Sequence, residues 1–72
     1  MANITAHIAG TVWKIECGVG DTLEEGDTVA ILESMKMEMP VETEEAGTVT
    51  EIVVNEGDAI NEGDVLVIIE PA

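Results

Sequence analysis

The chain has 72 residues, of which 46% are apolar, and Trp13 is its only Phe, Tyr or Trp residue. We therefore expect one small domain with an aliphatic core. Sixteen acidic residues against two lysines give a formal net charge of −14, which argues against nucleic acid or an anionic membrane as a partner. One cysteine, Cys17, excludes an intrachain disulfide, and no apolar run approaches the roughly 20 residues of a membrane span. We therefore expect a cytoplasmic protein that is monomeric when isolated.

The first half of the chain predicts two strands joined by glycine turns. Residues 11–17 (TVWKIEC) contain β-branched residues after an Ala-Gly turn, and residues 28–33 (TVAILE) are almost continuously apolar, which is typical of a buried strand. Between them, residues 20–27 (GDTLEEGD) place two Gly-Asp turns around Leu23. Glycine allows positive φ there, and aspartate can accept hydrogen bonds from nearby backbone N–H groups.

The middle of the chain predicts a tight reversal. Residues 35–39 (MKMEM) alternate methionine with a charged residue, and this period of two favours an extended chain with the methionines on one side. The strand that ends at Glu33 must reverse before the next strand, which contains residues 40–44 (PVETE). The reversal therefore falls close to residues 35–36 and presents Lys36 as an accessible amine.

The second half repeats the first. Residues 9–33 align with residues 46–70 without a gap at a constant offset of 37, and the repeats extend over about 3–33 and 40–70. This predicts further strands in 48–54 and 65–70. Because each half is too small for a core of its own, we expect the two to pack about a pseudo-twofold axis. We expect each half to supply one sheet, with the segment between the repeats on the axis.

Few residues outside the middle segment indicate chemistry. The acids of the Gly-Asp turns lack the alternating ligand series of a calcium loop. His7 and Cys17 stand alone and form neither a metal set nor a catalytic triad, and Cys17 is best interpreted as a small apolar strand residue. Lys14 lies within a predicted strand beside Trp13, so it is a weaker candidate for modification than Lys36. No pattern indicates an enzyme.

Met35-Lys36-Met37 matches the Met-Lys-Met of biotinyl domains, with Ser34 where that family often has alanine. Lipoyl domains more often read Asp-Lys-Ala at this point. Over residues 1–72 the chain resembles the biotinyl/lipoyl attachment domains, and most of all the small stand-alone attachment proteins. The resemblance implies an all-β flattened barrel of two four-stranded antiparallel sheets. It also implies quasi-twofold symmetry and a modified lysine at a hairpin turn.

The resemblance implies a non-catalytic biotin carboxyl carrier. Biotin protein ligase would join biotin to Lys36 through an amide, with Met35 and Met37 helping partners to distinguish this turn from that of a lipoyl domain. Biotin carboxylase would load the carboxyl group, and carboxyltransferase would remove it. The alternatives are a lipoyl carrier or dual acceptor, which a lipoyl ligase would modify on Lys36, and an unmodified interaction module whose surface is Trp13 and the acids.

Overall fold

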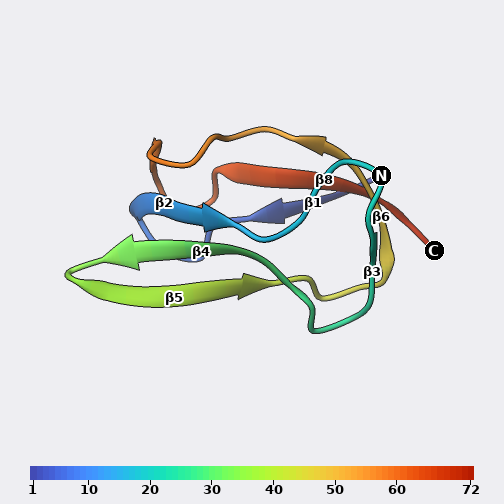
Figure 1. The fold of residues 1–72 in the computed structure, drawn as a ribbon, viewed down its shortest axis with the longest axis horizontal. Helices are drawn as coiled ribbons and strands as arrows, with labels where there is room; N and C mark the ends of the chain where they lie inside the picture. The colour runs from blue at the N-terminus through green and yellow to red at the C-terminus, as the bar shows by residue number, and fades with distance from the viewer.

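The computed structural model describes all 72 residues, and its regular elements are all strands (Figure 1). They form two four-stranded antiparallel sheets, which confirms the predicted fold class. No helix in the structure is long and apolar enough to cross a membrane. The strands are β1 (Ala2–Thr5), β2 (Gly10–Ile15), β3 (Thr22–Leu23), β4 (Thr28–Ser34), β5 (Met37–Glu42), β6 (Gly47–Ile52), β7 (Ala59–Ile60) and β8 (Val65–Pro71).

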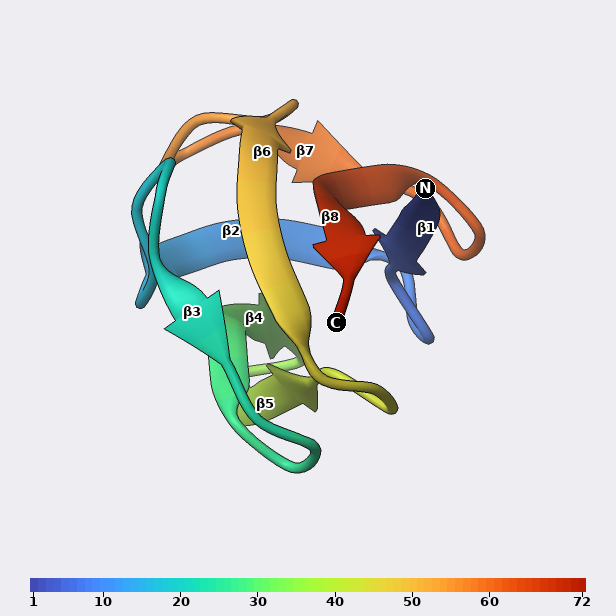
Figure 2. The same ribbon diagram turned by 90° about the vertical axis from the view of Figure 1, so that its right-hand side faces the viewer.

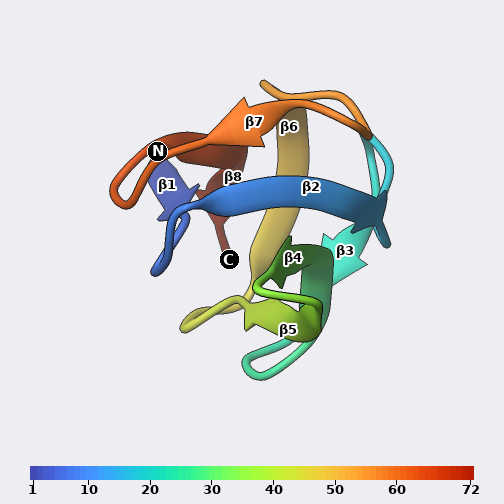
Figure 3. The same cartoon turned by 90° about the vertical axis from the view of Figure 1, so that its left-hand side faces the viewer.

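Each sheet contains two strands from each half of the chain. The strand orders are β1-β8-β6-β3 and β5-β4-β2-β7, so the expectation that each repeat supplies a whole sheet was wrong. The segment after β2 crosses to the other sheet, where β3 pairs with β6 of the second repeat. β6 lies in front of β2 in Figure 2 and behind it in Figure 3, so the sheets enclose the core between them. The exchange lets the two halves bury one shared core.

The offset of 37 recurs in the backbone hydrogen bonds. The Ala6 N–H donates to the Asp64 carbonyl over 2.9 Å, and its counterpart Thr43 donates to Asp27 over the same distance. This is the quasi-twofold relation that the repeat predicts. Adding this offset to residues 35–36 gives the end of the chain, so the symmetry relates the β4–β5 turn to the chain termini. Figure 1 shows the turn and the termini at opposite ends of the molecule. A segment on the twofold axis would be related by the symmetry to itself and not to the chain ends. The expectation that the segment between the repeats lies on the axis was therefore wrong.

Four turns of the same type explain the Gly-Asp pairs. In each, an aspartate N–H donates to the carbonyl of the residue three positions earlier, at 3.0–3.1 Å. Its carboxylate accepts the N–H of that same residue at 2.8–2.9 Å. The preceding glycine has φ between +91° and +95°, a region that side chains other than glycine rarely adopt. The aspartates are Asp21, Asp27, Asp58 and Asp64, and they serve the turns.

The core is aliphatic, as composition predicts. Thirteen buried apolar residues form one cluster between the sheets. Leu23 and Ile60, the apolar residues inside the two Gly-Asp segments, are both buried in it, and each belongs to a two-residue strand. The largest side chains that are fully buried are Leu32, Leu66, Ile69, Val12, Val29, Val49 and Val67.

Candidate functional site

The candidate site is the hairpin turn between β4 and β5. The two strands pair without a shift from Ala30 opposite Val41 to Ser34 opposite Met37, which leaves Met35 and Lys36 alone in the turn. The structure thus places the reversal where the sequence predicts it. Further back, Leu32 of β4 is fully buried, so the strand that carries the turn is anchored in the core.

Both turn residues have a left-handed backbone, with φ of 53° at Met35 and 63° at Lys36. Two consecutive residues with positive φ are the signature of the type I′ hairpin turn, whose twist matches that of the flanking strands. Asn and Gly usually occupy such positions, because a Cβ disfavours this conformation. The extended alternation predicted for residues 35–39 therefore begins only at Met37, and sequence reasoning did not foresee the strained pair.

The side chains of the turn project into solvent. Met35 is 92% exposed and Met37 58% exposed, whereas Met39 is only partly exposed. Lys36 is exposed, and its side chain makes neither a hydrogen bond nor an ion pair with a carboxylate. The turn forms the far end of the elongated molecule (Figure 1). A primary amine is thus held on a fixed backbone with free space around it.

The second lysine has different surroundings. Lys14 lies in β2 opposite Ile31, and its Nζ is 3.8 Å from Oε1 of Glu16. Trp13 lies at an irregularity in the pairing of β2 with β4 and is 47% exposed, so it covers the barrel only in part. The Lys14 side chain is 55% exposed, but it leaves from a paired strand and has a carboxylate nearby, whereas Lys36 leaves from a hairpin tip.

Cys17 and His7 are not brought into a reactive cluster. Cys17 follows β2 instead of lying within it as predicted, and it packs partly buried against the core. Burial raises the pKa of the Cys17 thiol, and the negative charge of Asp21 adds to the increase, so the nucleophilic thiolate is disfavoured. His7 is exposed between β1 and β2. No three His, Cys, Asp or Glu side chains are grouped so that they could hold a metal ion.

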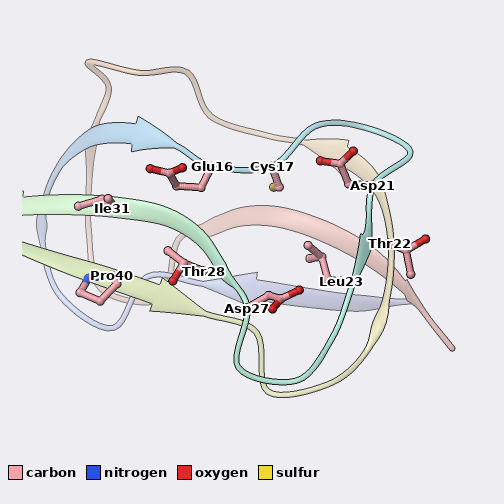
Figure 4. Close-up of a pocket in the computed structure, with 9 residues that line it drawn as sticks. All are labelled: Glu16, Cys17, Asp21, Thr22, Leu23, Asp27, Thr28, Ile31 and Pro40. Atoms are coloured by element: carbon pink, nitrogen blue, oxygen red, sulfur yellow. The ribbon is translucent and has the colours of Figure 1, made fainter.

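One hollow on the surface, lined by residues of β3, β4 and β5 and by the segments around them, lies away from the hairpin turn. It is an open depression of about 600 Å³, and Figure 4 shows Glu16, Cys17 and Asp21 along one side of it. Asp21 and Asp27, which also line it, already accept backbone hydrogen bonds in their turns. The carboxylates of both aspartates are therefore already used by the turns of the fold.

Comparison with known proteins identifies the family. Residues 1–69 match the sequence model of the biotin/lipoyl family, which is described as "Biotin-requiring enzyme". The biotin/lipoyl attachment protein of Bacillus subtilis (strain 168) is 50% identical over 38 residues, which cover 53% of this chain and 52% of that protein. Methylmalonyl-CoA decarboxylase subunit gamma of Propionigenium modestum is 46% identical over 35 residues, 49% of this chain and 26% of the subunit. The aligned region thus spans about half of the first relative and a quarter of the second.

Solved structures show the same fold inside much larger proteins. The urea carboxylase of Kluyveromyces lactis superposes with a TM-score of 0.90 at 36% identity, covering 96% of this chain and 6% of the carboxylase. A single-chain, multi-domain long-chain acyl-CoA carboxylase superposes with a TM-score of 0.86 at 27% identity, covering 92% of this chain and 6% of that enzyme. The chain belongs to the biotin/lipoyl attachment family.

Proposed function

We propose that this chain is a biotin carboxyl carrier, with biotin joined to the side-chain amine of Lys36. The observation that carries the proposal is the contrast between the chain's two lysines. Lys36 stands at a solvent-exposed hairpin tip without a hydrogen bond or an ion pair, whereas Lys14 lies within strand β2 near Glu16. The Bacillus subtilis relative, which is named as a biotin/lipoyl attachment protein, and the family description "Biotin-requiring enzyme" support biotin as the group.

The residues at the turn fit such an attachment. No neighbouring side chain forms an ion pair with the Lys36 amine. The left-handed backbone of Met35 and Lys36 fixes the direction in which the lysine side chain leaves the barrel. When attached, biotin supplies a ring that takes up a carboxyl group at one enzyme and releases it at another. The chain provides position and reach for this chemistry, so we assign it no catalytic residue.

Attachment changes both charge and effective concentration. An amide replaces the ammonium group, which takes the formal net charge of the chain from −14 to −15. Tethering makes each encounter with a bound partner's active site an intramolecular event, at an effective concentration set by the length of the arm. The stiff turn keeps the volume searched by the arm small.

The proposed partners follow from this role. A biotin protein ligase would modify Lys36, a biotin carboxylase would load the carrier and a carboxyltransferase would unload it. Two of the relatives described above are a decarboxylase subunit and a carboxylase, which supports partners of this class. We propose that the chain acts as a monomer in the cytoplasm, where its one free cysteine would stay reduced.

Matched lysine variants test the proposal. The wild-type chain, Lys36→Arg and Lys14→Arg are each incubated with biotin, ATP and biotin protein ligase, and avidin binding and intact mass are measured. We expect Lys14→Arg to be biotinylated like the wild type and Lys36→Arg to remain unmodified. Biotinylated chain should then take up label from bicarbonate when a biotin carboxylase and ATP are added. Biotinylation of Lys36→Arg at the wild-type rate would overturn the assignment.

A lipoyl carrier is the second candidate, because the Bacillus subtilis relative is named for both prosthetic groups. The same variants incubated with lipoate and a lipoyl ligase decide this point. Lipoate on Lys36 without biotin would make the chain a lipoyl carrier, and either group on Lys36 would make it a dual acceptor. If neither ligase modifies the chain while both modify control domains, the chain is an interaction module.

A further inference from the structure

The four methionines of the chain differ widely in exposure. Met35 is 92% exposed, Met1 87% and Met37 58%, while Met39 is partly buried beside β4. Thioethers are oxidised by peroxides, and a thioether that solvent reaches freely is the more open to attack. Met35 is the most exposed of the four and is the sequence neighbour of Lys36.

We propose that Met35, together with Met37, is a peroxide-sensitive modification site that controls the acylation of Lys36; the inference rests on the proposed carrier function. In the reaction, the Met35 sulfur attacks one oxygen of hydrogen peroxide. The O–O bond breaks and an S–O bond forms, and the second oxygen leaves as hydroxide, which takes the proton from the sulfur-bound oxygen and becomes water. The sulfur is oxidised by two electrons, and the product is methionine sulfoxide.

Oxidation at Met35 acts on recognition and leaves the fold intact. A side chain that is 92% exposed contributes almost nothing to the core, and Met37 lies at the first position of β5 with more than half of its surface exposed. Sulfoxides at these two positions therefore have little effect on folding stability. Met39 is different, because it pairs with the fully buried Leu32 and is partly buried itself.

The effect on acylation follows from the size of the turn. Only Met35 and Lys36 form it, so an enzyme that brings the Lys36 amine to an acyl donor must surround the tip and cover Met35. Covering a thioether removes apolar surface from water, which favours binding. A sulfoxide placed in the same contact buries a strong acceptor, which costs free energy unless the enzyme supplies a donor. Oxidised chain should thus be acylated about tenfold more slowly.

The test separates oxidation from acylation. Unmodified wild-type chain is treated with graded hydrogen peroxide and quenched, and each methionine is followed by peptide mapping. We expect Met35 to be oxidised early and Met39 last. The rate of biotin attachment is then measured with fresh ligase, before and after a methionine sulfoxide reductase is applied to the oxidised chain. The fall in rate should be about tenfold and should be reversed by the reductase.

Two variants identify the responsible sulfur atoms. M35L/M37L keeps apolar side chains at the turn, and its acylation should not respond to peroxide. V19M/M35L/M37L places a thioether at Val19, which is 66% exposed in the Gly18–Asp21 turn, outside the β4–β5 turn. This variant should be oxidised at residue 19 and still be acylated at its untreated rate. Cys17 is present in every variant and serves as an internal control for thiol oxidation.

The proposal is overturned if oxidised wild-type chain is acylated at the untreated rate. It is also overturned if M35L/M37L is slowed as much as the wild type, or if the reductase removes the sulfoxides without restoring the rate. Failure of the carrier function is recognised separately, because untreated chain would then not be biotinylated at Lys36 at all. The order of methionine oxidation is read from mass alone and does not depend on either ligase.

Discussion

Two glycines at equivalent positions of the repeat, Gly10 and Gly47, lie where neighbouring backbone leaves no space for a side chain. A Cβ on Gly47 would lie 2.5 Å from the carbonyl oxygen of Glu70 and 3.1 Å from its carbonyl carbon. A Cβ on Gly10 would come even closer to the carbonyl oxygen of Glu33. Neither glycine has positive φ, so lack of space is the constraint. We predict that Gly10→Ala and Gly47→Ala both destabilise the fold.

The size of the effect follows from the overlap. Non-bonded atoms prefer separations of about 3.5 Å, so the paired strands must move apart by roughly 1 Å. Overpacking of this kind typically costs about 1–3 kcal/mol. In a domain of this size each kcal/mol lowers the melting temperature by about 4–8 °C, so we expect a fall of about 10 °C for either variant.

Thermal and urea unfolding, monitored by circular dichroism, measure the loss of folding stability. Gly18→Ala is the matched control. A Cβ on Gly18 would meet only Oδ2 of Asp21, at 3.7 Å, so this variant should stay within about 0.5 kcal/mol of the wild type. If Gly10→Ala and Gly47→Ala were as stable as Gly18→Ala, the reasoning from close approach would be refuted.

The two glycines should differ in their effect on the candidate site. A Cβ on Gly10 would also lie 3.3 Å from Cβ of Ser34, the residue immediately before Met35, whereas Gly47 faces the C-terminal end of β8. Gly10→Ala should therefore slow biotin attachment to Lys36, measured at a temperature where both variants are folded. Equal slowing by Gly47→Ala would show that the loss reflects general instability.

Three further predictions concern the core, the thiol and a buried hydroxyl. Leu66→Ala removes a fully buried side chain and should lower the free energy of unfolding by about 2–5 kcal/mol. Urea unfolding should then show a largely unfolded chain, and a loss below about 1 kcal/mol would contradict the assigned core. Because burial and Asp21 raise the pKa of the Cys17 thiol, iodoacetamide should react with it more slowly at pH 8 than with a model thiol, and Asp21→Asn should speed the reaction; equal alkylation rates for the chain and the model thiol would contradict this. The folded chain holds the thiol proton more tightly than the unfolded chain, so folding stability should fall as pH rises above the ordinary thiol range. The buried Thr43 hydroxyl donates to the Glu45 carbonyl over 2.6 Å, so Thr43→Ala should cost about 1 kcal/mol in the same unfolding assay, and an unchanged midpoint would count against the bond.

The sequence predicts the local features of this fold well. The Gly-Asp pairs predict turns because glycine supplies positive φ and aspartate supplies an acceptor, and the structure contains all four. The reversal at residues 35–36 could also be predicted, because a strand that ends at Glu33 and a strand that contains Pro40 leave little chain between them. These features depend on residues that are close together in the sequence.

The division of strands between the sheets could not be predicted in the same way. Two similar halves carry the same local patterns whether strands pair within a half or between halves, so the pairing of β3 with β6 depends on contacts made only in the folded chain. The Glu56 carboxylate, which accepts the Ile15 N–H over 3.0 Å, is another such contact, and its counterpart in the first repeat is Val19. The left-handed backbone at Met35 is likewise imposed by the hairpin, because methionine itself disfavours it.

The most direct test of the central claim is intact-mass measurement and peptide mapping of the chain after co-expression with biotin protein ligase and lipoyl ligase, with both cofactors supplied. We expect a single biotinyl adduct on the peptide that contains Lys36 and none on the peptide that contains Lys14. A lipoyl adduct alone would redirect the carrier to lipoate. An adduct on Lys14, or an unmodified chain beside control domains that both ligases modify, would show that Lys36 is not the attachment site of a biotin carrier.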